Sequence, residues 1–352
     1  MNEAINKKDL VKNNMAVVNN SILAASTETG CTGIYQLKRL WSKAIAGPHV
    51  DNEYPEEKAL DNTLIDILGI GLLPTYRFLY EQKPDFDSFE KWVIAHANGS
   101  IAAETIELCN ALFDNNSFCH QPITADVLTP EDIAFWEAYG YVIVKNAVTQ
   151  QDCADSRKAI MDFLKMDEQD ATSWYRRNDD MQGIMVNLYN NTAINKNRNS
   201  PRIRRAFEQL WNRRDLVVTT DKCGFNPPET VTFKYMGTGL HWDVSLATPI
   251  PFGTQGILYL TDTAVNQGAL TVVPGFHKDI ETWLNSLPKN INPRETDFSS
   301  FAPIPVAAHA GDLIIWNHKL PHGSSPNKAR LPRIVQYINW YAALEKVQEE
   351  WK

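Results

Sequence analysis

Seven short segments rich in β-branched and aromatic residues follow one another through the second half of the chain. Gly, Pro, Asn or Asp separate them, and from about residue 183 onward they read GIMVNLY, LVVTTD, TVTFKYM, GILYLTD, ALTVVP, DLIIWNH and RIVQYINWY. Many short strands bounded by turn residues are typical of antiparallel sandwiches and barrels. The pattern predicts a mainly β fold, namely a double-stranded β-helix (a cupin-like jelly roll), with flanking helices packed on one sheet.

The residues before this series follow a helical pattern. Apolar residues recur at helical spacing in EEKALDNTLIDILGIGLL, SFEKWVIAHA and AAETIELCNALF. The stretch SFCHQPITADVLTP then has the composition of a linker. We therefore expect two domains, an N-terminal helical region over residues 1–120 and the jelly roll over residues 121–352. The helical region could cover the mouth of a site or form a dimer interface, and its sequence favours neither role.

Two helices are expected at the start of the jelly-roll region. Thr129 is a suitable N-cap for a helix with Pro130 in its first position, and Gly140 is a suitable C-cap. A β-branched strand, YVIVKNAV, follows, and Thr149 can cap the next helix. Further along, Ser200 can cap PRIRRAFEQLW, the one helix that interrupts the strand series.

Composition limits the classes of function. The chain has 352 residues, 43% of them hydrophobic, and its formal net charge of −8 argues against nucleic-acid binding. No apolar run approaches the roughly 20 residues that cross a bilayer, and the N-terminus lacks the apolar core of a secretory signal. Five Cys without a CxxC motif are typical of reduced, buried thiols. We expect a cytoplasmic monomer or homodimer without a membrane partner.

A candidate metal-binding pair lies in the segment LHWDVS. In an extended chain, residues i and i+2 point to the same side, so His241 and Asp243 would project together while Trp242 packs the other way. Such a pair arises easily by chance, and a metal needs a third ligand from elsewhere in the fold. We favour His322, in the turn after DLIIWNH, and keep His318 as an alternative.

An arginine follows the third candidate ligand. Arg333 begins the strand RIVQYINWY, and a hairpin would return it toward the pocket that His322 faces; Arg330 is the less favoured alternative. Two His and one carboxylate on one side of a metal suit non-heme Fe(II) enzymes that activate O₂. An Arg behind such a cluster offers a fixed fork for a carboxylate.

The segments GTGLHWDVS, GALTVVPGFHK and GDLIIWNHKLPHGSSPN, followed by PR, resemble the phytanoyl-CoA dioxygenase family of Fe(II)- and 2-oxoglutarate-dependent oxygenases. The resemblance spans roughly residues 128–341 and includes the opening FWEAYGYVIVKNAV. It implies a hydroxylase that uses Fe(II), 2-oxoglutarate, O₂ and a small-molecule substrate, and releases succinate and CO₂. The helical region before residue 120 lies outside it.

The resemblance also implies roles for single residues. His241, Asp243 and His322 would hold the iron, and Arg333 would bind the distal carboxylate of 2-oxoglutarate. Ser324 would contact that same carboxylate, and Lys234 is a weaker candidate for contact with cosubstrate or substrate. Related halogenases lack the carboxylate ligand, so the presence of Asp243 favours hydroxylation. Two alternatives stay open: a catalytically silent jelly-roll binding protein, and a cupin-type enzyme with a non-redox metal.

A run of arginines bears on the substrate. It lies in NKNRNSPRIRRAFEQLWNRRD, where Arg198 and Arg202 stand near the helix start. These two could bind an anionic substrate such as an acyl-CoA, a phosphate or an amino acid carboxylate. A solvated helix face that balances an acidic chain is an equally good interpretation.

Overall fold

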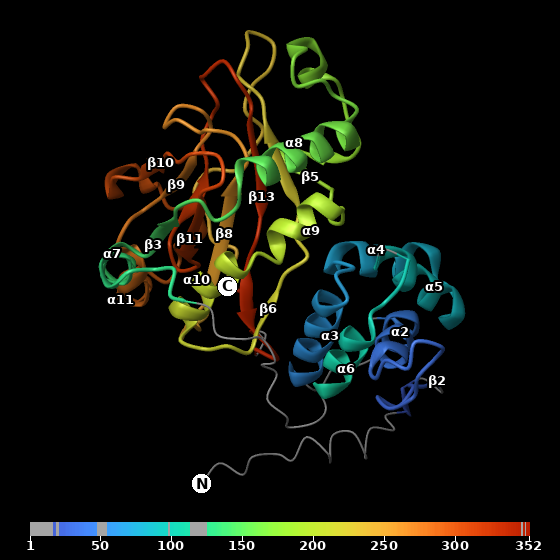
Figure 1. The fold of residues 1–352 in the computed structure, drawn as a ribbon. Helices are drawn as coiled ribbons and strands as arrows, with labels where there is room; N and C mark the ends of the chain where they lie inside the picture. Colours follow the sequence, from blue (N-terminus) through green and yellow to red (C-terminus); the bar gives the residue numbers. More distant parts are fainter. Residues whose placement is uncertain are drawn as a thin grey trace. The chain divides into compact units, whose positions relative to one another are not determined.

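The computed structural model describes residues 17–18, 21–47, 55–97, 99–112, 125–345, 348 and 350–352 (Figure 1). Contacts between Cα atoms divide the chain into two compact units. The first comprises residues 1–122, 213–220 and 342–349, and the second comprises residues 123–212, 221–341 and 350–352. The helical unit thus includes two segments that lie far along the chain, besides the N-terminal region.

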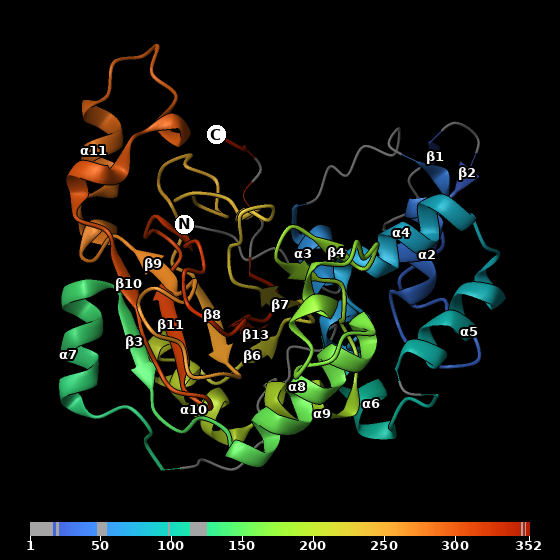
Figure 2. The same ribbon diagram turned by 90° about the horizontal axis from the view of Figure 1, so that it is seen from above.

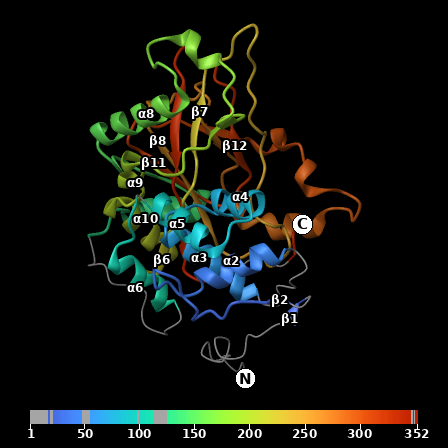
Figure 3. The ribbon, with the colours of Figure 1, turned by 90° about the vertical axis from the view of Figure 1, so that its right-hand side faces the viewer.

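Helices dominate the first unit (Figure 3). Gly69 and Gly71, both at positive φ, divide the apolar stretch at residues 56–73 between two helices, because glycine adopts this conformation without strain. The core is apolar and includes Leu40, Leu64 and Phe89. The elements of this unit are β1 (Val17–Val18), β2 (Ser21–Ile22), α2 (Leu37–Ala46), α3 (Pro55–Ile67), α4 (Leu72–Gln82), α5 (Phe86–His96), α6 (Ala103–Ala111) and β6 (Leu216–Val218).

Two antiparallel sheets form the second unit. The larger sheet has the strand order β3-β11-β8-β13-β7-β5-β4, and the smaller has the order β10-β9-β12. They share one core, to which Ile257 and Val335 contribute from the larger sheet and Leu270 and Val272 from the smaller. This arrangement is the predicted jelly roll. The strands are β3 (Tyr141–Val144), β4 (Met181–Gln182), β5 (Met185–Val186), β7 (Cys223–Asn226), β8 (Thr254–Tyr259), β9 (Leu270–Val272), β10 (Ile304–Val306), β11 (Leu313–Asn317), β12 (His322–Ser324) and β13 (Arg333–Tyr337), with β14 (Trp340–Ala342) after them.

Helices cover the outer face of the larger sheet (Figure 2). Asn197 at the end of α9 donates a hydrogen bond to Gln336 of β13, and Arg157 of α8 donates to the carbonyl of Leu260 just after β8. Phe207 of α10 is fully buried. The unit's helices are α7 (Pro130–Tyr139), α8 (Gln150–Leu164), η1 (Ala171–Tyr175), α9 (Thr192–Arg198), α10 (Pro201–Trp211), η2 (Phe276–Lys278), α11 (Ile280–Ser286), η3 (Pro293–Glu295) and η4 (Phe298–Phe301).

The predicted helix ends are present. Thr129 and Thr149 each form a capping box at the start of α7 and α8, Ser200 accepts a hydrogen bond at the start of α10, and Gly140 ends α7 in the left-handed conformation. These local signals act within four residues, which explains why the sequence alone reveals them.

One predicted strand is wrong. TVTFKYM contains no strand, and residues 227–240 follow an irregular path. Strand β7 ends at Asn226, directly before Pro227 and Pro228, which cannot donate ladder hydrogen bonds. The Thr230 N–H instead donates to the Phe233 carbonyl at 2.9 Å, so this backbone turns on itself.

The remaining expectations concern the N-terminal residues, the linker, the cysteines and membrane spans. The first 16 residues and most of the predicted linker, with Cys119, lie outside the described residues. Cys109, Cys153 and Cys223 are buried as expected, whereas Cys31 is exposed, which corrects the expectation for that residue. Its thiol lies in a turn before α2, where no core surrounds it. Within the described residues, no helix is both long enough and apolar enough to span a membrane.

Candidate active site

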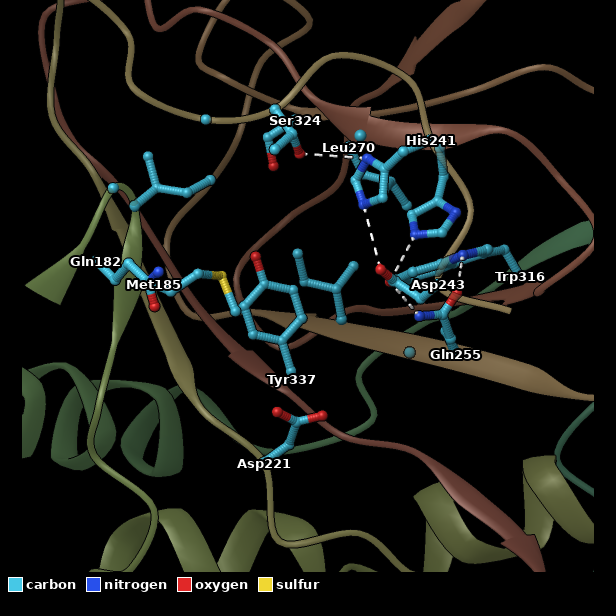
Figure 4. Close-up of a pocket in the computed structure, with 18 of the residues that line it drawn as sticks. Gln182, Met185, Asp221, His241, Asp243, Gln255, Leu270, Trp316, Ser324 and Tyr337 are labelled. Atoms are coloured by element: carbon cyan, nitrogen blue, oxygen red, sulfur yellow. Dashed lines mark hydrogen bonds and ion pairs between the residues drawn. The ribbon is translucent and has the colours of Figure 1, made fainter. Parts of the chain in front are cut away.

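The three predicted ligands converge in the second unit (Figure 4). Candidate ligand atoms of His241, Asp243 and His322 all lie within 4.8 Å of one another. The Asp243 carboxylate is 3.4 Å from Nε2 of His241 and 3.2 Å from Nε2 of His322. Two imidazole nitrogens and one carboxylate therefore face a common point, an arrangement that can hold a divalent metal.

A short backbone contact joins the two histidines. His322 begins β12, and the backbone N–H groups of His241 and His322 donate to each other's carbonyls at 2.9 and 3.0 Å. His241 is thus held by an isolated bridge outside the named strands. Trp242 packs into the core as predicted, and its indole donates to the Lys319 carbonyl.

Backbone carbonyls set the proton positions on both imidazoles. Nδ1 of His241 lies 2.8 Å from the Gly239 carbonyl, and Nδ1 of His322 lies 3.1 Å from the Leu320 carbonyl. A carbonyl only accepts hydrogen bonds, so each Nδ1 carries the proton, and each Nε2 offers a lone pair when the ring is neutral. This tautomer suits metal ligation through Nε2.

The alternative histidine faces elsewhere. Nε2 of His318 lies 2.8 Å from the Pro251 carbonyl, and His318 does not line the pocket that contains the three ligands. Burial lowers the pKa of His318 to about 4, so the ring is neutral near pH 7. The geometry favours His322 over His318 as the third candidate ligand.

Two further side chains position Asp243. The Gln255 amide donates to the Asp243 carboxylate at 2.7 Å, and the Trp316 indole fixes that amide by donating to its oxygen at 3.1 Å. Arg294 donates to the carbonyls of Trp242 and Val244, the residues on either side of Asp243. Partial burial raises the pKa of Asp243, but hydrogen bonds from Gln255 and from His241 and His322 in their protonated form outweigh it and hold that pKa far below its usual value in the metal-free site.

Replacing Gln255 with leucine should weaken iron binding about 10- to 100-fold, as is usual when a residue that orients a metal ligand is lost. The leucine keeps the side-chain volume but no longer holds the carboxylate oxygen. Anaerobic Fe(II) titration measures the affinity. Gln182→Leu is the matched control, because Gln182 lines the same pocket, and the hydrogen bonds that Asp243 accepts within the described residues come from other side chains. Equal affinity in Gln255→Leu and the wild type would contradict the orienting role.

Arg333 is fully buried on the inward face of β13. Residues 333, 335 and 337 point to the same side of that strand, and Val335 belongs to the core between the sheets. Among the described residues, no carboxylate pairs with the Arg333 guanidinium and its nitrogens have no well-formed hydrogen bond, although it interacts with the Tyr337 hydroxyl and opposes the rise in pKa that burial causes there. Burial raises the pKa of Tyr235 and of Tyr259 to about 12, and the nearby Arg333 charge partly opposes this rise. A buried unpaired guanidinium is costly, so this position suits an anionic ligand.

The metal cluster opens onto a pocket of about 550 Å³. Ser324, the last residue of β12, lines it, as do Tyr235 and Tyr337. Lys234 does not: its side chain is exposed, because the irregular segment after β7 turns Tyr235 inward in its place. The lining residues are Gln182, Gly183, Ile184, Met185, Asp221, Tyr235, Met236, Gly237, Thr238, His241, Asp243, Gln255, Gly256, Ile257, Leu270, Trp316, His322, Gly323, Ser324, Tyr337 and Asn339.

The structure does not bring the two substrate candidates from the arginine run to this pocket. Arg198 is buried and donates to the Asn195 side chain and to the carbonyls of Tyr189 and Asp221. Arg202 donates to the Lys145 carbonyl and lines a separate surface cavity. Arg198 thus ties backbone segments together, and neither arginine supports an anionic substrate at the metal cluster.

Sequence reasoning missed Asp221, Gln255 and Arg294. Gln255 carried a usable signal, since it shares the inward face of β8 with Ile257 and Tyr259, where an amide is unusual. Asp221 and Arg294 lie in irregular segments, and only the fold brings them near the site. No pattern in the sequence marks them.

Comparison with known proteins identifies the family. The sequence model of the family described as Phytanoyl-CoA dioxygenase (PhyH) matches residues 136–335, more than half of the chain. A Dictyostelium discoideum protein named as a phytanoyl-CoA dioxygenase is 23% identical over 255 residues, covering 58% of this chain and 73% of that protein.

Two solved structures are also similar. EctD from S. alaskensis in its apoform matches with a TM-score of 0.47 and 15% identity over 65% of this chain and 82% of its own. The non-heme alpha ketoglutarate dependent carbocyclase SnoK from nogalamycin biosynthesis matches with a TM-score of 0.43 and 17% identity over 63% and 87%. On the sequence match over residues 136–335, the chain belongs to the phytanoyl-CoA dioxygenase family.

Proposed function

We propose that the protein is an Fe(II)- and 2-oxoglutarate-dependent oxygenase that hydroxylates a small molecule. The observation that carries this proposal is the pairing of a two-histidine, one-carboxylate cluster with a fully buried, unpaired Arg333. The cluster alone suits several divalent metals. The Arg333 guanidinium, which no carboxylate of the described residues balances, favours binding of a carboxylate ligand. 2-Oxoglutarate carries such a group.

The donor set fits the two cofactors. His241, Asp243 and His322 offer two neutral nitrogens and one negative charge, and they would hold a divalent metal with the donor set that non-heme Fe(II) oxygenases use. Arg333 would pair with the distal carboxylate of 2-oxoglutarate, and the Ser324 hydroxyl would donate to that carboxylate. When bound, the cofactors supply the oxidising chemistry: O₂ and 2-oxoglutarate give succinate and CO₂, and one oxygen atom enters a substrate C–H bond.

The remaining residues orient the ligands and shield the pocket. Gln255 and Arg294 hold Asp243, which supports hydroxylation since this carboxylate occupies the position that related halogenases leave to a halide. The β4–β5 hairpin packs closely on the segment after β7, because a Cβ atom at Gly183 would lie only 2.8 Å from the Met236 carbonyl oxygen. Walls of this kind exclude water from a reacting centre.

A matched pair of histidine variants tests the proposal. With Fe(II), O₂, 2-oxoglutarate and a metabolite extract, the wild type should form succinate and a product heavier by one oxygen atom. His322→Ala should lose both products, and His318→Ala should keep them, because His318 faces Pro251. Mass spectrometry of the extract measures the outcome. The reverse pattern would place the third ligand at residue 318.

The same experiment separates the two alternatives. A catalytically silent binding protein would consume neither 2-oxoglutarate nor O₂, even without coupled product. A cupin-type enzyme with a non-redox metal would act on its substrate without 2-oxoglutarate, and Arg333→Gln would leave its activity unchanged.

A further inference from the structure

The backbone that carries Asp243 lies outside the two sheets. Residues 242–250 form no strand, and the bridge between His241 and His322 is isolated. Trp242 packs into the core, whereas the Asp243 side chain is 54% exposed. The sheet ladders therefore hold this backbone at one residue, and its path beyond that residue depends on other contacts.

Arg294 supplies two of these contacts from η3. Its Nη1 donates to the Trp242 carbonyl at 2.9 Å, and its Nη2 donates to the Val244 carbonyl at 2.8 Å. These carbonyls belong to the residues on either side of Asp243. The guanidinium is a rigid planar group, so the two bonds fix the spacing of the carbonyls. Arg294 thus holds the peptide groups on both sides of a candidate metal ligand.

The same guanidinium binds residues 350–352, which we call the docked segment. Nε and Nη2 of Arg294 donate to the Lys352 carbonyl at 3.1 and 2.6 Å, and its Cζ lies 5.0 Å from the centroid of the Trp351 ring. Residues 342–349 belong to the first unit, whereas the docked segment belongs to the second. The chain therefore returns to the second unit where Arg294 binds it.

Ser245 and Leu246 connect the docked segment to the ligand backbone directly. The Ser245 hydroxyl is fully buried, donates to the Glu350 carbonyl at 2.6 Å and accepts from the Lys352 N–H at 3.1 Å. The Leu246 N–H donates to the Lys352 carbonyl at 3.2 Å. Buried polar groups that lose such partners cost free energy. Residues 242–246 therefore keep their path only while the docked segment is in place.

We propose that Arg294 and the docked segment are positioning groups of the metal site, and that metal affinity depends on the docking of residues 350–352. A ligand must be held within about 0.5 Å of its productive position, which an unsupported loop does not achieve. The docked segment lies outside the family match over residues 136–335, so this support is a feature of the present chain. The inference rests on the proposed function for its metal site and does not require 2-oxoglutarate.

The charge of Arg294 acts in the opposite direction from its position. A cation beside the cluster repels a bound metal ion, so loss of the charge alone should strengthen metal binding. Loss of positioning should weaken it. Arg294→Lys keeps the charge but replaces the planar fork with a compact ammonium, and Arg294→Met removes both. The two variants therefore separate positioning from electrostatics.

Calorimetric titration with Zn(II) measures the metal affinity. Arg294→Lys, Arg294→Met and deletion of residues 350–352 should each lower it about tenfold or more, as for other groups that orient a metal ligand. Combining Arg294→Met with the deletion should cost less than the product of the separate losses, because both act on one segment. Arg177→Met is the control, since the Arg177 side chain is 93% exposed in the same unit.

Hydrogen exchange gives a readout that a purely structural role would not change. Coupling between two sites is reciprocal, so Zn(II) should slow exchange of the Leu246 and Lys352 amides, whose hydrogen bonds join the docked segment to the ligand backbone. Arg294→Met should lose this response to Zn(II). The measurement on the wild type tests the inference even if a variant does not fold.

Three results would overturn the inference: wild-type affinity in the deletion variant, tighter Zn(II) binding in Arg294→Met with no loss in Arg294→Lys, or amide exchange at Leu246 and Lys352 that Zn(II) leaves unchanged. A wild type that binds no Zn(II) would refute the metal site of the proposed function. A wild type that binds Zn(II) without these responses would refute only the inference.

Discussion

Replacing Asp243 with alanine is expected to lower the iron affinity at least about 100-fold, because it removes the one anionic ligand of the cluster. Hydroxylation should be lost with it. The fold should remain, because the Asp243 side chain is 54% exposed. The free energy of unfolding should change by no more than about 1 kcal/mol.

Anaerobic Fe(II) titration and thermal unfolding of the same preparation measure both effects. Asp179→Ala is the control, since it removes an equally charged side chain from the surface of the same unit. Full iron affinity in Asp243→Ala would show that the convergence of the three side chains is not a metal site.

Arg333→Met should stabilise the cofactor-free protein and abolish binding of 2-oxoglutarate. The Arg333 guanidinium is fully buried, and within the described residues no carboxylate balances its charge, so it costs folding free energy. An apolar side chain of similar length removes that cost, and we expect a gain of about 1 to 4 kcal/mol. The affinity for 2-oxoglutarate should fall at least about 100-fold, because a buried charged pair loses one partner.

Thermal unfolding in the presence of Zn(II), with and without 2-oxoglutarate, measures both the gain in stability and the loss of 2-oxoglutarate binding. The cosubstrate should raise the melting temperature of the wild type and leave that of Arg333→Met unchanged. Arg330→Met is the matched control, because Arg330 is exposed three residues earlier and should affect neither quantity. A variant that is less stable and still binds 2-oxoglutarate would refute the role of Arg333.

The sequence was most informative where the signals were local. Capping residues such as Thr129 and Thr149 act within one helical turn, and the helices they start were predicted correctly. The strand TVTFKYM was predicted from side-chain composition alone. A strand also needs a partner with free ladder groups, and Pro227 with Pro228 ends the pairing before this segment.

The site was predictable in part, because its members lie in two short segments. His241 and Asp243 are two residues apart, and His322 and Arg333 flank one loop, so family resemblance could suggest all four. The structure brings the first three together and buries the fourth. Asp221, Gln255 and Arg294 come from three separate parts of the chain, and only tertiary structure relates them.

The contacts of Arg198 could not be predicted from the sequence. Its place in an arginine-rich run near a helix start suggested an anion-binding or solvated side chain, but its guanidinium meets the carbonyls of Tyr189 and Asp221 and is buried there. A sequence pattern reveals that an arginine is present and does not reveal which acceptors the fold supplies. Lys234 differs by one position from the residue that enters the pocket, and an irregular backbone makes such a shift impossible to foresee.

The stoichiometry of 2-oxoglutarate turnover tests the central claim most directly. With Fe(II) and O₂, protein incubated with 2-oxoglutarate labelled at its C1 carboxylate should release labelled CO₂ and succinate in equal amounts. One O₂ should be consumed for each, and release should fall to background in His322→Ala. No CO₂ release above that variant, with metabolite extracts or without them, would contradict the assignment of this site as a 2-oxoglutarate-dependent oxygenase centre.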